Sequence, residues 1–510
     1  MSDKSVAAAL RSKHRLVAIE APGGCGKTYQ AAEYAHDSAA GIAPGRMLIL
    51  THTHGACDVI AARTQSAQGR VEIRTIDSVL GHIASAYHQG LGLPPDAAAW
   101  ARQKGGDGFQ ELATKVARLL KDAPSIAWAL TQRYPLIVCD EHQDATLEQH
   151  GLIQALHDAG ASVRIFFDFE QRIFPDRSSK KNPGSNAGPP WRDWLKHADV
   201  TEKLGYPHRW MPDSEELGRW ILAARETLRD GGQIDLRGKL PAGVRVAFAE
   251  NHAQAYGRYQ TDPKERKPID AFVQANPKLL ILATTNDMAR GLRAFFGRRI
   301  PIWEGYTRDA LDTLIASTRA ANGDVQVVGE AMLNFLGKVA RGFTPSGDGK
   351  ILLREISEAC VKRRTGKPAA LQELARFILD APDHRGVARA LGRLAEQTRA
   401  GQILSSVEID LNRELWEAVK LAEFEDAEAG LAEITQRRTY SRRPPPARAI
   451  STVHKAKGLE CQSVLVMPCD GAHFTEKADH RRLLYVALSR PTRSLMLVLS
   501  RQKPSPLFQL

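Results

Sequence analysis

The most restrictive feature of this chain is Val17–Thr28, VAIEAPGGCGKT, an apolar run that breaks into a glycine-rich loop ending in Lys-Thr. The run predicts a buried strand and the loop predicts a turn into a helix. Glycines let backbone N–H groups turn inward around phosphate oxygens, where Cβ atoms would obstruct them. A helix that begins near Lys27 adds favourable partial charge for an anion. An ordinary glycine-rich turn is the alternative, but the Gly-Lys-Thr ending favours a nucleoside triphosphate site.

The loop offers specific contacts to a nucleotide and its metal. Lys27 can reach the β- and γ-phosphates, and the Thr28 hydroxyl can ligate Mg²⁺. Ala21 stands where the usual pattern has its first glycine. The predicted contacts of the loop are Ala21, Pro22, Gly23, Gly24, Cys25, Gly26, Lys27 and Thr28.

A second apolar run, Tyr134–Cys139, leads directly into Asp140 and Glu141. The first carboxylate is predicted to hold Mg²⁺, and the second to orient and deprotonate an attacking water. A solvated acidic loop is the alternative. It is disfavoured because a strand ending in paired carboxylates follows a phosphate loop in the same α/β segment.

Length, net charge, cysteine spacing and the lengths of the apolar runs limit the classes of protein to which this chain could belong. The 510 residues predict two or more domains. The formal charge of +12 suits a polyanionic partner such as nucleic acid, although an ordinary basic enzyme would also fit. The six cysteines form no CxxC pair, the N-terminus lacks the apolar core of a signal peptide, and no apolar run is long enough to span a bilayer. We therefore expect a reduced, cytoplasmic protein with no membrane partner.

Strand-like runs alternate with helical patterns at both ends of the chain, which predicts an α/β fold with parallel sheets. We expect a first lobe from residues 1–78 and 134–203, interrupted by a small helical insertion at 79–133. A second lobe is expected from 204–304 and 447–510, interrupted by a helical insertion at 305–446. Lys264–Lys267 is expected in a loop, and Glu414–Ile434 as one acidic amphipathic helix.

Taken together, GKT, DEHQD, HKAKGLE and RRLLYVALSR resemble the motifs of UvrD/Rep/PcrA-type superfamily 1 DNA helicases. The resemblance implies two RecA-like P-loop NTPase lobes, each with a mainly helical insertion. It also implies that the lobes clamp ATP and Mg²⁺ between them while single-stranded or partly duplex DNA crosses their tops. The compact insertions resemble the helicase subunits of Gabija-type anti-phage systems, which work beside a separate nuclease.

The resemblance also assigns roles residue by residue. Gln171 is expected to sense the γ-phosphate, and Arg209 and Arg490 to stabilise charge on the transferred phosphoryl group. The further nucleotide contacts that it implies are His208, Gly458 and Glu460. The implied DNA contacts are Thr51, His52, Thr75, Ser78, Phe174, Arg177, Thr452 and His454.

The sequence departs from the family pattern at several points. No upstream adenine-reading glutamine is found, so the preference for ATP over GTP stays open. Asp77 and Asp176 stand where the family places residues that contact DNA. Two functions therefore remain open. One is an ATP-dependent helicase or translocase, 3′→5′ by resemblance, in DNA repair, recombination or antiviral defence. The other is a nucleic-acid-gated ATPase that serves as a sensor subunit of a nuclease complex and unwinds little.

Overall fold

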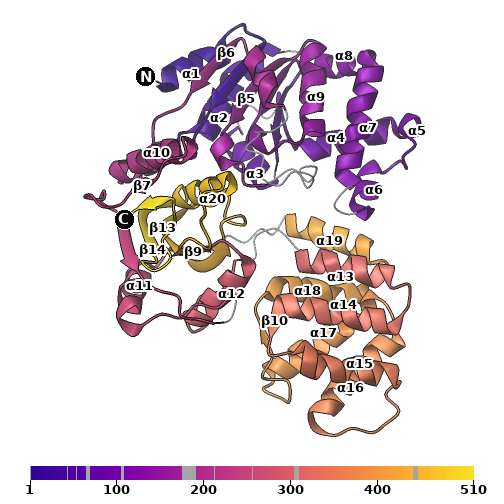
Figure 1. Ribbon diagram of the computed structural model, residues 1–510. Helices are drawn as coiled ribbons and strands as arrows, with labels where there is room; N and C mark the ends of the chain where they lie inside the picture. Colours follow the sequence, from indigo (N-terminus) through magenta and orange to yellow (C-terminus); the bar gives the residue numbers. More distant parts are fainter. Residues whose placement is uncertain are drawn as a thin grey trace. The chain divides into compact units, whose positions relative to one another are not determined.

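The computed structural model describes residues 2–42, 44–52, 54–64, 69–104, 108–174, 191–211, 213–254, 257–303, 309–439 and 446–510. The chain forms two compact units (Figure 1). The first comprises Met1–Ala253, Gln260–Thr284 and Thr452–Leu510, and the second comprises Gln254–Tyr259 and Thr285–Ser451. Among the helices in these ranges, none is long and apolar enough to cross a membrane.

The first unit contains a six-stranded parallel sheet in the order β3-β2-β4-β5-β1-β6. Strands β4, β5 and β1 are neighbours, so their carboxyl ends meet at one edge of the sheet. Such an edge is where open α/β sheets bind ligands. The strands are β1 (Leu16–Glu20), β2 (Met47–Thr51), β3 (Val71–Thr75), β4 (Leu136–Cys139), β5 (Ser162–Phe167) and β6 (Val200–Lys203).

Helices cover both faces of this sheet, because side chains alternate between faces along each strand. Val17 and Ile19 pack with α1 (Ser2–Arg11) and α2 (Lys27–Ser38). Leu16 and Ala18 belong to the core on the opposite face. The helices packed there or nearby are α4 (Ile76–Ala86), α5 (His88–Leu91), α6 (Ala97–Gln103), α7 (Gly108–Asp122), α8 (Pro124–Arg133) and α9 (Leu147–Asp158). Between β2 and β3 lies α3 (His54–Arg63).

The first unit also contains four parallel strands of a second, five-stranded sheet, in the order β9-β13-β14-β8. Its strands are β8 (Val244–Phe248), β9 (Leu279–Ala283), β13 (Cys461–Cys469) and β14 (Pro491–Leu499). The associated helices are α10 (Glu215–Arg229), α11 (Pro263–Ala275) and α20 (Ala478–Leu488), and β7 (Ile234–Asp235) pairs with β15 (Phe508–Gln509). Two parallel sheets with helices confirm the predicted α/β class and are consistent with two RecA-like lobes.

The loop expected at Lys264–Lys267 is wrong, because these residues form the first turns of α11. Pro263 occupies the first helical position, where its fixed φ favours the helix and its missing N–H costs nothing. The strand β6 and the helix α1 had no counterpart in the sequence prediction.

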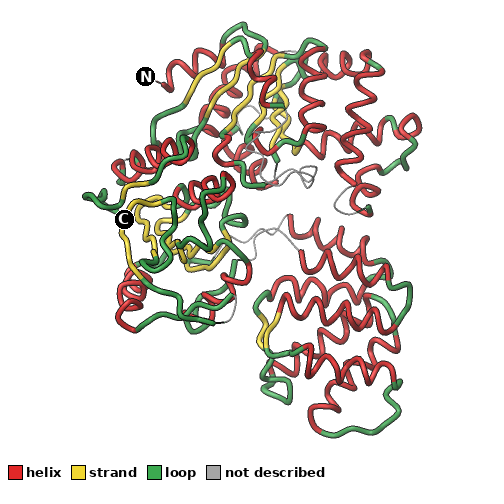
Figure 2. Tube along the Cα trace, viewed as in Figure 1, coloured by secondary structure: helices red, strands yellow, loops and turns green. Residues whose placement is uncertain are grey.

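The second unit is mainly helical, as Figure 2 shows. Its small antiparallel ribbon pairs β10 (Ala340–Arg341) with β11 (Glu408–Ile409). The chain passes from this unit to the first within β12 (Arg448–Thr452). The helices are α12 (Asn286–Phe295), α13 (Asp309–Ala320), α14 (Val325–Val339), α15 (Lys350–Ser357), α16 (Gly366–Asp380), α17 (His384–Arg399), α18 (Asn412–Lys420) and α19 (Ala427–Thr439).

The single helix expected at Glu414–Ile434 is also wrong. The chain forms α18, a short 3₁₀ turn at Leu421–Glu423, and then α19. The break has a local cause, because the Asp426 carboxylate accepts the backbone N–H of Ala429 at 2.7 Å and starts a new helix. The carbonyl of Phe424 lies 3.0 Å from Nε2 of His384, outside any helical bond.

Candidate nucleotide-binding site

The loop between β1 and α2 has the backbone that a phosphate loop requires. Gly24 and Gly26 both have a φ of +85°, in the left-handed region that favours glycine. A Cβ atom on Gly24 would lie 2.6 Å from the Trp210 ring, and one on Gly26 would lie 2.9 Å from Cδ2 of His208. The 3₁₀ turn η8 (His208–Trp210) therefore packs directly on the loop. The backbone N–H of Arg209 also donates to the Gly24 carbonyl at 2.9 Å.

The other predicted loop residues are mostly enclosed. Ala21 is fully buried, and its N–H donates to the Phe167 carbonyl at 2.8 Å. The Cys25 N–H donates to the Pro22 carbonyl at 3.1 Å. Burial and the nearby Asp168 raise the pKa of the Cys25 thiol to about 12, so this cysteine is a small apolar side chain rather than a nucleophile.

The loop lysine and the two carboxylates meet at the edge of the sheet. Nζ of Lys27 lies 3.5 Å from Oδ1 of Asp140 and forms an ion pair with Glu141. Burial alone would lower the pKa of Lys27, but Glu141 and Asp140 outweigh it and raise that pKa. Burial also opposes ionisation of Glu141, yet Lys27 and Lys457 hold its pKa down to about 2. Glu141 is therefore ionised at neutral pH.

Asp140 fits the role of a metal ligand. Its Oδ1 atom is buried and makes no hydrogen bond within the described residues. Burial raises the pKa of Asp140; Lys27 opposes this shift and the Glu141 charge adds to it. A divalent cation would compensate this buried carboxylate, and hard oxygen ligands such as Asp140 and the Thr28 hydroxyl suit Mg²⁺.

Glu141 is held in an unusual conformation. Its φ of +53° places a non-glycine residue in the left-handed region, which costs about 1–3 kcal/mol. The Gln143 amide donates to the Glu141 carboxylate, while Oε1 of Gln143 accepts the N–H of Asp168 at 3.0 Å. The carboxylate is thus aimed by a strained backbone and a neighbouring amide.

Gln171 is linked to the phosphate loop through a buried network. Its Nε2 donates to Oδ2 of Asp168 at 3.0 Å, and the Tyr485 hydroxyl donates to the same oxygen at 3.2 Å. The Gly23 N–H donates to the Tyr485 hydroxyl at 3.0 Å. A Cβ atom on Gly23 would lie 2.5 Å from Nε2 of Gln171. The loop, the predicted sensor and α20 therefore share one set of contacts.

Sequence reasoning missed three members of this network. Asp168 is fully buried and receives the fully enclosed Arg225 guanidinium at 2.7 Å, which also pairs with Glu20 at 2.6 Å. A strand ending in aspartate and the tyrosine of RRLLYVALSR were available as signals for Asp168 and Tyr485. Arg225, in the middle of α10, had no sequence signal.

The two arginines predicted for the second lobe lie close together. Arg490 is buried, and it donates to the Val486 carbonyl at 2.9 Å and to the Ser489 hydroxyl at 2.7 Å. Burial and the charge of Arg209 lower the pKa of Arg490 to about 10. Arg209 donates to the Ser489 carbonyl at 2.7 Å and pairs with Glu460 at 2.6 Å. Three predicted nucleotide-site residues are thus brought together.

His208 and Gly458 complete the predicted nucleotide contacts. Nε2 of His208 lies 2.5 Å from a carboxylate oxygen of Asp3 in α1, and its ring meets Tyr206 edge-on. Gly458 is exposed, with a φ of +85° and open space where a Cβ atom would stand.

An exposed aromatic surface follows the predicted sensor. Phe174 is half exposed, and its ring centroid lies 5.9 Å from that of His454. Nζ of Lys457 lies 5.3 Å from the Phe174 ring centroid and donates to the Gln171 carbonyl at 2.7 Å. The same ammonium forms an ion pair with Asp144. Lys457 stands in the KAKGLE segment but was not among the predicted site residues.

The remaining predicted DNA contacts are more enclosed. Oγ1 of Thr75 accepts the Ser78 N–H at 3.2 Å and caps α4. Oγ1 of Thr452 accepts the Lys455 N–H at 3.3 Å. Thr51 is buried, with Oγ1 3.1 Å from Sγ of Cys57, and His52 is partly buried. Arg177 and Asp176 lie outside the described residues.

Comparison with family models agrees with this architecture. Residues 97–182 match the UvrD/REP helicase N-terminal domain, and residues 448–498 match the UvrD-like helicase C-terminal domain. These segments carry Asp140, Glu141 and Gln171 in the first case and Glu460 and Arg490 in the second. These two matches support a UvrD/Rep/PcrA-like helicase. No curated protein matches it.

UvrD-like helicase domains imply ATP-dependent hydrolase activity and DNA binding, and UvrD-like helicases generally use ATP with Mg²⁺. Neither match separates the anti-phage subunits from other UvrD-like helicases, so that narrower resemblance stays a prediction.

Proposed function

We propose that this UvrD-like protein is an ATP-driven translocase and helicase that moves 3′→5′ along single-stranded DNA. The observation that carries the proposal is the position of Lys457. Its ammonium pairs with Asp144 beside the two carboxylates, donates to the Gln171 carbonyl and lies over the exposed Phe174 ring. A change at the nucleotide can therefore reach a surface on which a base could stack.

The hydrolysis step follows from the residues around the loop. Water attacks the γ-phosphorus, the bond to the β–γ bridging oxygen breaks, and Glu141 accepts the water proton. A γ-phosphate would draw Lys27 away from Glu141, whose pKa then rises toward its ordinary value and makes it a better base. Mg²⁺, held by Asp140 and Thr28, would supply positive charge to the phosphates. Arg209 and Arg490 would stabilise charge on the transferred group.

We further propose the wider set of strand contacts that the family pattern implies, with Phe174 and His454 at its centre. The compact insertions favour work beside a separate nuclease, in DNA repair, recombination or phage defence. Net positive charge supports a sequence-independent grip on phosphates, which makes binding salt-dependent.

The position of Asp77 favours the second function, a nucleic-acid-gated ATPase. Asp77 lies in the first turn of α4, beside the predicted contacts Thr75 and Ser78, and its carboxylate accepts a hydrogen bond from Gln149 at 2.7 Å. A fixed negative charge there would weaken the hold on a phosphate. A nucleic-acid-gated ATPase that senses DNA without unwinding much would tolerate this.

The deciding experiment measures ATP hydrolysis with and without single-stranded DNA, with Lys27→Ala as the blank, and strand displacement in parallel. Stimulation by DNA together with displacement supports the motor. Stimulation without displacement supports the sensor. Turnover that ignores DNA would contradict both.

A further inference from the structure

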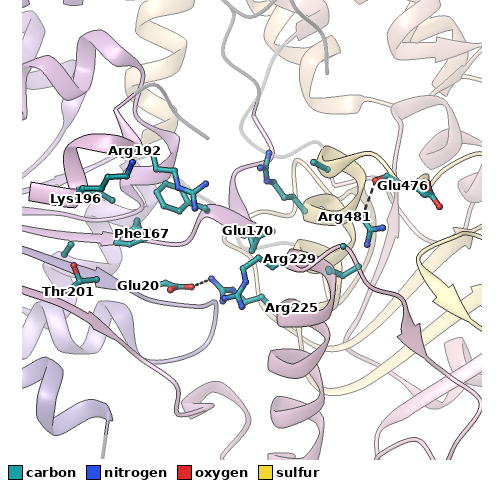
Figure 3. A pocket seen from close by; sticks show the side chains of 17 residues that line it. Glu20, Phe167, Glu170, Arg192, Lys196, Thr201, Arg225, Arg229, Glu476 and Arg481 are labelled. Atoms are coloured by element: carbon teal, nitrogen blue, oxygen red, sulfur yellow. Dashed lines mark hydrogen bonds and ion pairs between the residues drawn. The ribbon is translucent and has the colours of Figure 1, made fainter. Parts of the chain in front are cut away.

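A separate cavity of about 860 Å³ lies in the first unit, on the α9 side of the sheet. It is bounded by the carboxyl ends of β1 and β5, by β6, by the 3₁₀ turn η7 (Arg192–His197), and by α10 and α20 (Figure 3). Its lining shares no residue with the phosphate loop, the two carboxylates or the Phe174 surface. Its apolar wall consists of Ala18, Phe167, Phe169, Leu195 and Leu228.

The charged part of the lining is strongly basic. Three acidic residues, Glu20, Glu170 and Glu476, face six basic ones. Some of the basic groups are neutralised locally. Arg225 is held by Asp168 and Glu20, Arg229 by Glu226 and Asp230, and Lys196 by Asp193. The basic residues are Arg192, Lys196, Arg225, Arg229, Arg481 and Arg482.

Among the described residues, the other three guanidinium groups are less closely paired with carboxylates. Arg481 donates to the carbonyls of Gly232 and Glu476 at 2.6 and 3.2 Å, which fix its direction without neutralising it. Arg482 reaches only the largely exposed Asp479, at 3.4 Å, among the described carboxylates. Arg192 lies over the Phe169 ring at 4.7 Å, and the described part of the chain offers it no ion pair. Figure 3 shows Arg192 and Arg481 on opposite sides of Glu170.

This combination matches a nucleotide better than it matches other anions. Guanidinium groups bind phosphate oxygens in a two-pronged fashion. Bases stack on aromatic rings and on guanidinium planes, and Phe169 with Arg192 offers both. A carboxylate such as Glu170 can accept a hydrogen bond from a base amino group, whereas it would repel an acidic peptide. The volume lies in the range of small-molecule pockets.

We propose that this cavity is a second nucleotide-binding site, in which Arg481 and Arg482 hold phosphate and the stacked pair of Phe169 and Arg192 supports a base. The occupant is one nucleotide unit, either of a DNA strand or free in solution. Phe169 and Glu170 form the same 3₁₀ turn as Gln171, so an occupant would contact the segment that carries the predicted sensor. The site goes beyond the translocase function and does not depend on it.

The test uses Arg192→Glu and Arg482→Glu in the full chain, alone and combined. Arg219→Glu is the matched control, because Arg219 lies on α10, is largely exposed and is outside the lining. The strand probe is a labelled oligothymidylate, titrated by anisotropy at several salt concentrations. The free probe is a fluorescent AMP analogue, titrated in a Lys27→Ala background that weakens the main site. Thermal melting confirms that each variant is folded. If Arg192→Glu is not folded, Arg192→Gln takes its place.

If a strand occupies the site, oligothymidylate affinity falls about ten-fold and its salt slope drops by about 0.7 for each lost phosphate contact. If a free nucleotide occupies it, the AMP analogue loses affinity instead, by a similar factor. Unchanged binding of both probes relative to Arg219→Glu would overturn the proposal. Equal displacement of either probe by polyglutamate would overturn the assignment to nucleotides.

Discussion

Replacing Lys457 by methionine tests whether the nucleotide and strand surfaces are coupled through this ammonium. The Lys457 and Asp144 side chains are only 11% and 13% exposed, so the substitution leaves a nearly buried carboxylate unpaired. Breaking such a pair costs about 3 kcal/mol, the low end of the range for buried pairs, because both groups keep slight exposure. In a unit of the size of the first one, that corresponds to a fall in Tm of roughly 4 °C.

The functional effect of Lys457→Met should be more selective than the loss of stability. We expect ATP binding to persist while the stimulation of hydrolysis by single-stranded DNA falls at least ten-fold. Lys455→Met is the control, since it removes a lysine two positions away. The double variant with Asp144→Asn should recover about 1–3 kcal/mol relative to the sum of the single losses. Losses that add within about 0.5 kcal/mol, or full DNA stimulation in Lys457→Met, would refute the reasoning.

Further predictions concern the loop and its base. Glu141→Gln should retain ATP binding and lower kcat by about 10²–10⁴-fold, and wild-type kcat would remove Glu141 as the base. Because the folded pKa of Glu141 is depressed, it adds stability above its ordinary pKa of 4.5 that is lost as pH falls toward 2. Denaturant titrations across that window should show a smaller loss in Glu141→Gln. Gly24→Ala should weaken nucleotide binding and lower the free energy of unfolding by about 1 kcal/mol or more, because Gly24 has a φ of +85° and a Cβ atom there would meet the Trp210 ring. Gly41→Ala is the control and should have neither effect, since a Cβ atom on Gly41 would meet nothing. Tyr485→Phe should cost about 1–2 kcal/mol of unfolding free energy by leaving the Gly23 N–H unpaired, and an unchanged Tm would argue against that contact.

Local chemistry explains which parts of the fold could be predicted. The buried strands β2 and β4, and β1 up to Ile19, show as continuous apolar runs, so the parallel sheets follow from the sequence. The edge strand β6 reads VTEK and alternates between partly buried and exposed residues, which leaves no apolar run to find. The first turns of α11 contain the charged residues Lys264–Lys267, which show no apolar residues at helical spacing and were therefore predicted as a loop. The residue that indicates a helix start is Pro263.

The candidate site likewise has residues that the local sequence predicts and residues that it does not. The loop and the carboxylates Asp140 and Glu141 are each encoded within a few consecutive residues, so their chemistry is visible in the chain. The contacts among Asp168, Arg225 and Tyr485 join three distant segments, and only folding brings those segments together. No local pattern carries that information.

The left-handed backbone conformation of Glu141 affects which substitutions would raise the stability of this protein. Asparagine or glycine would adopt that conformation at lower cost, so the backbone favours replacing the very residue proposed as the base. Selection for thermal robustness alone would tend to erode activity at this position. A library screened only for folding should therefore enrich inactive chains here, which marks position 141 as a point where stability and activity trade off.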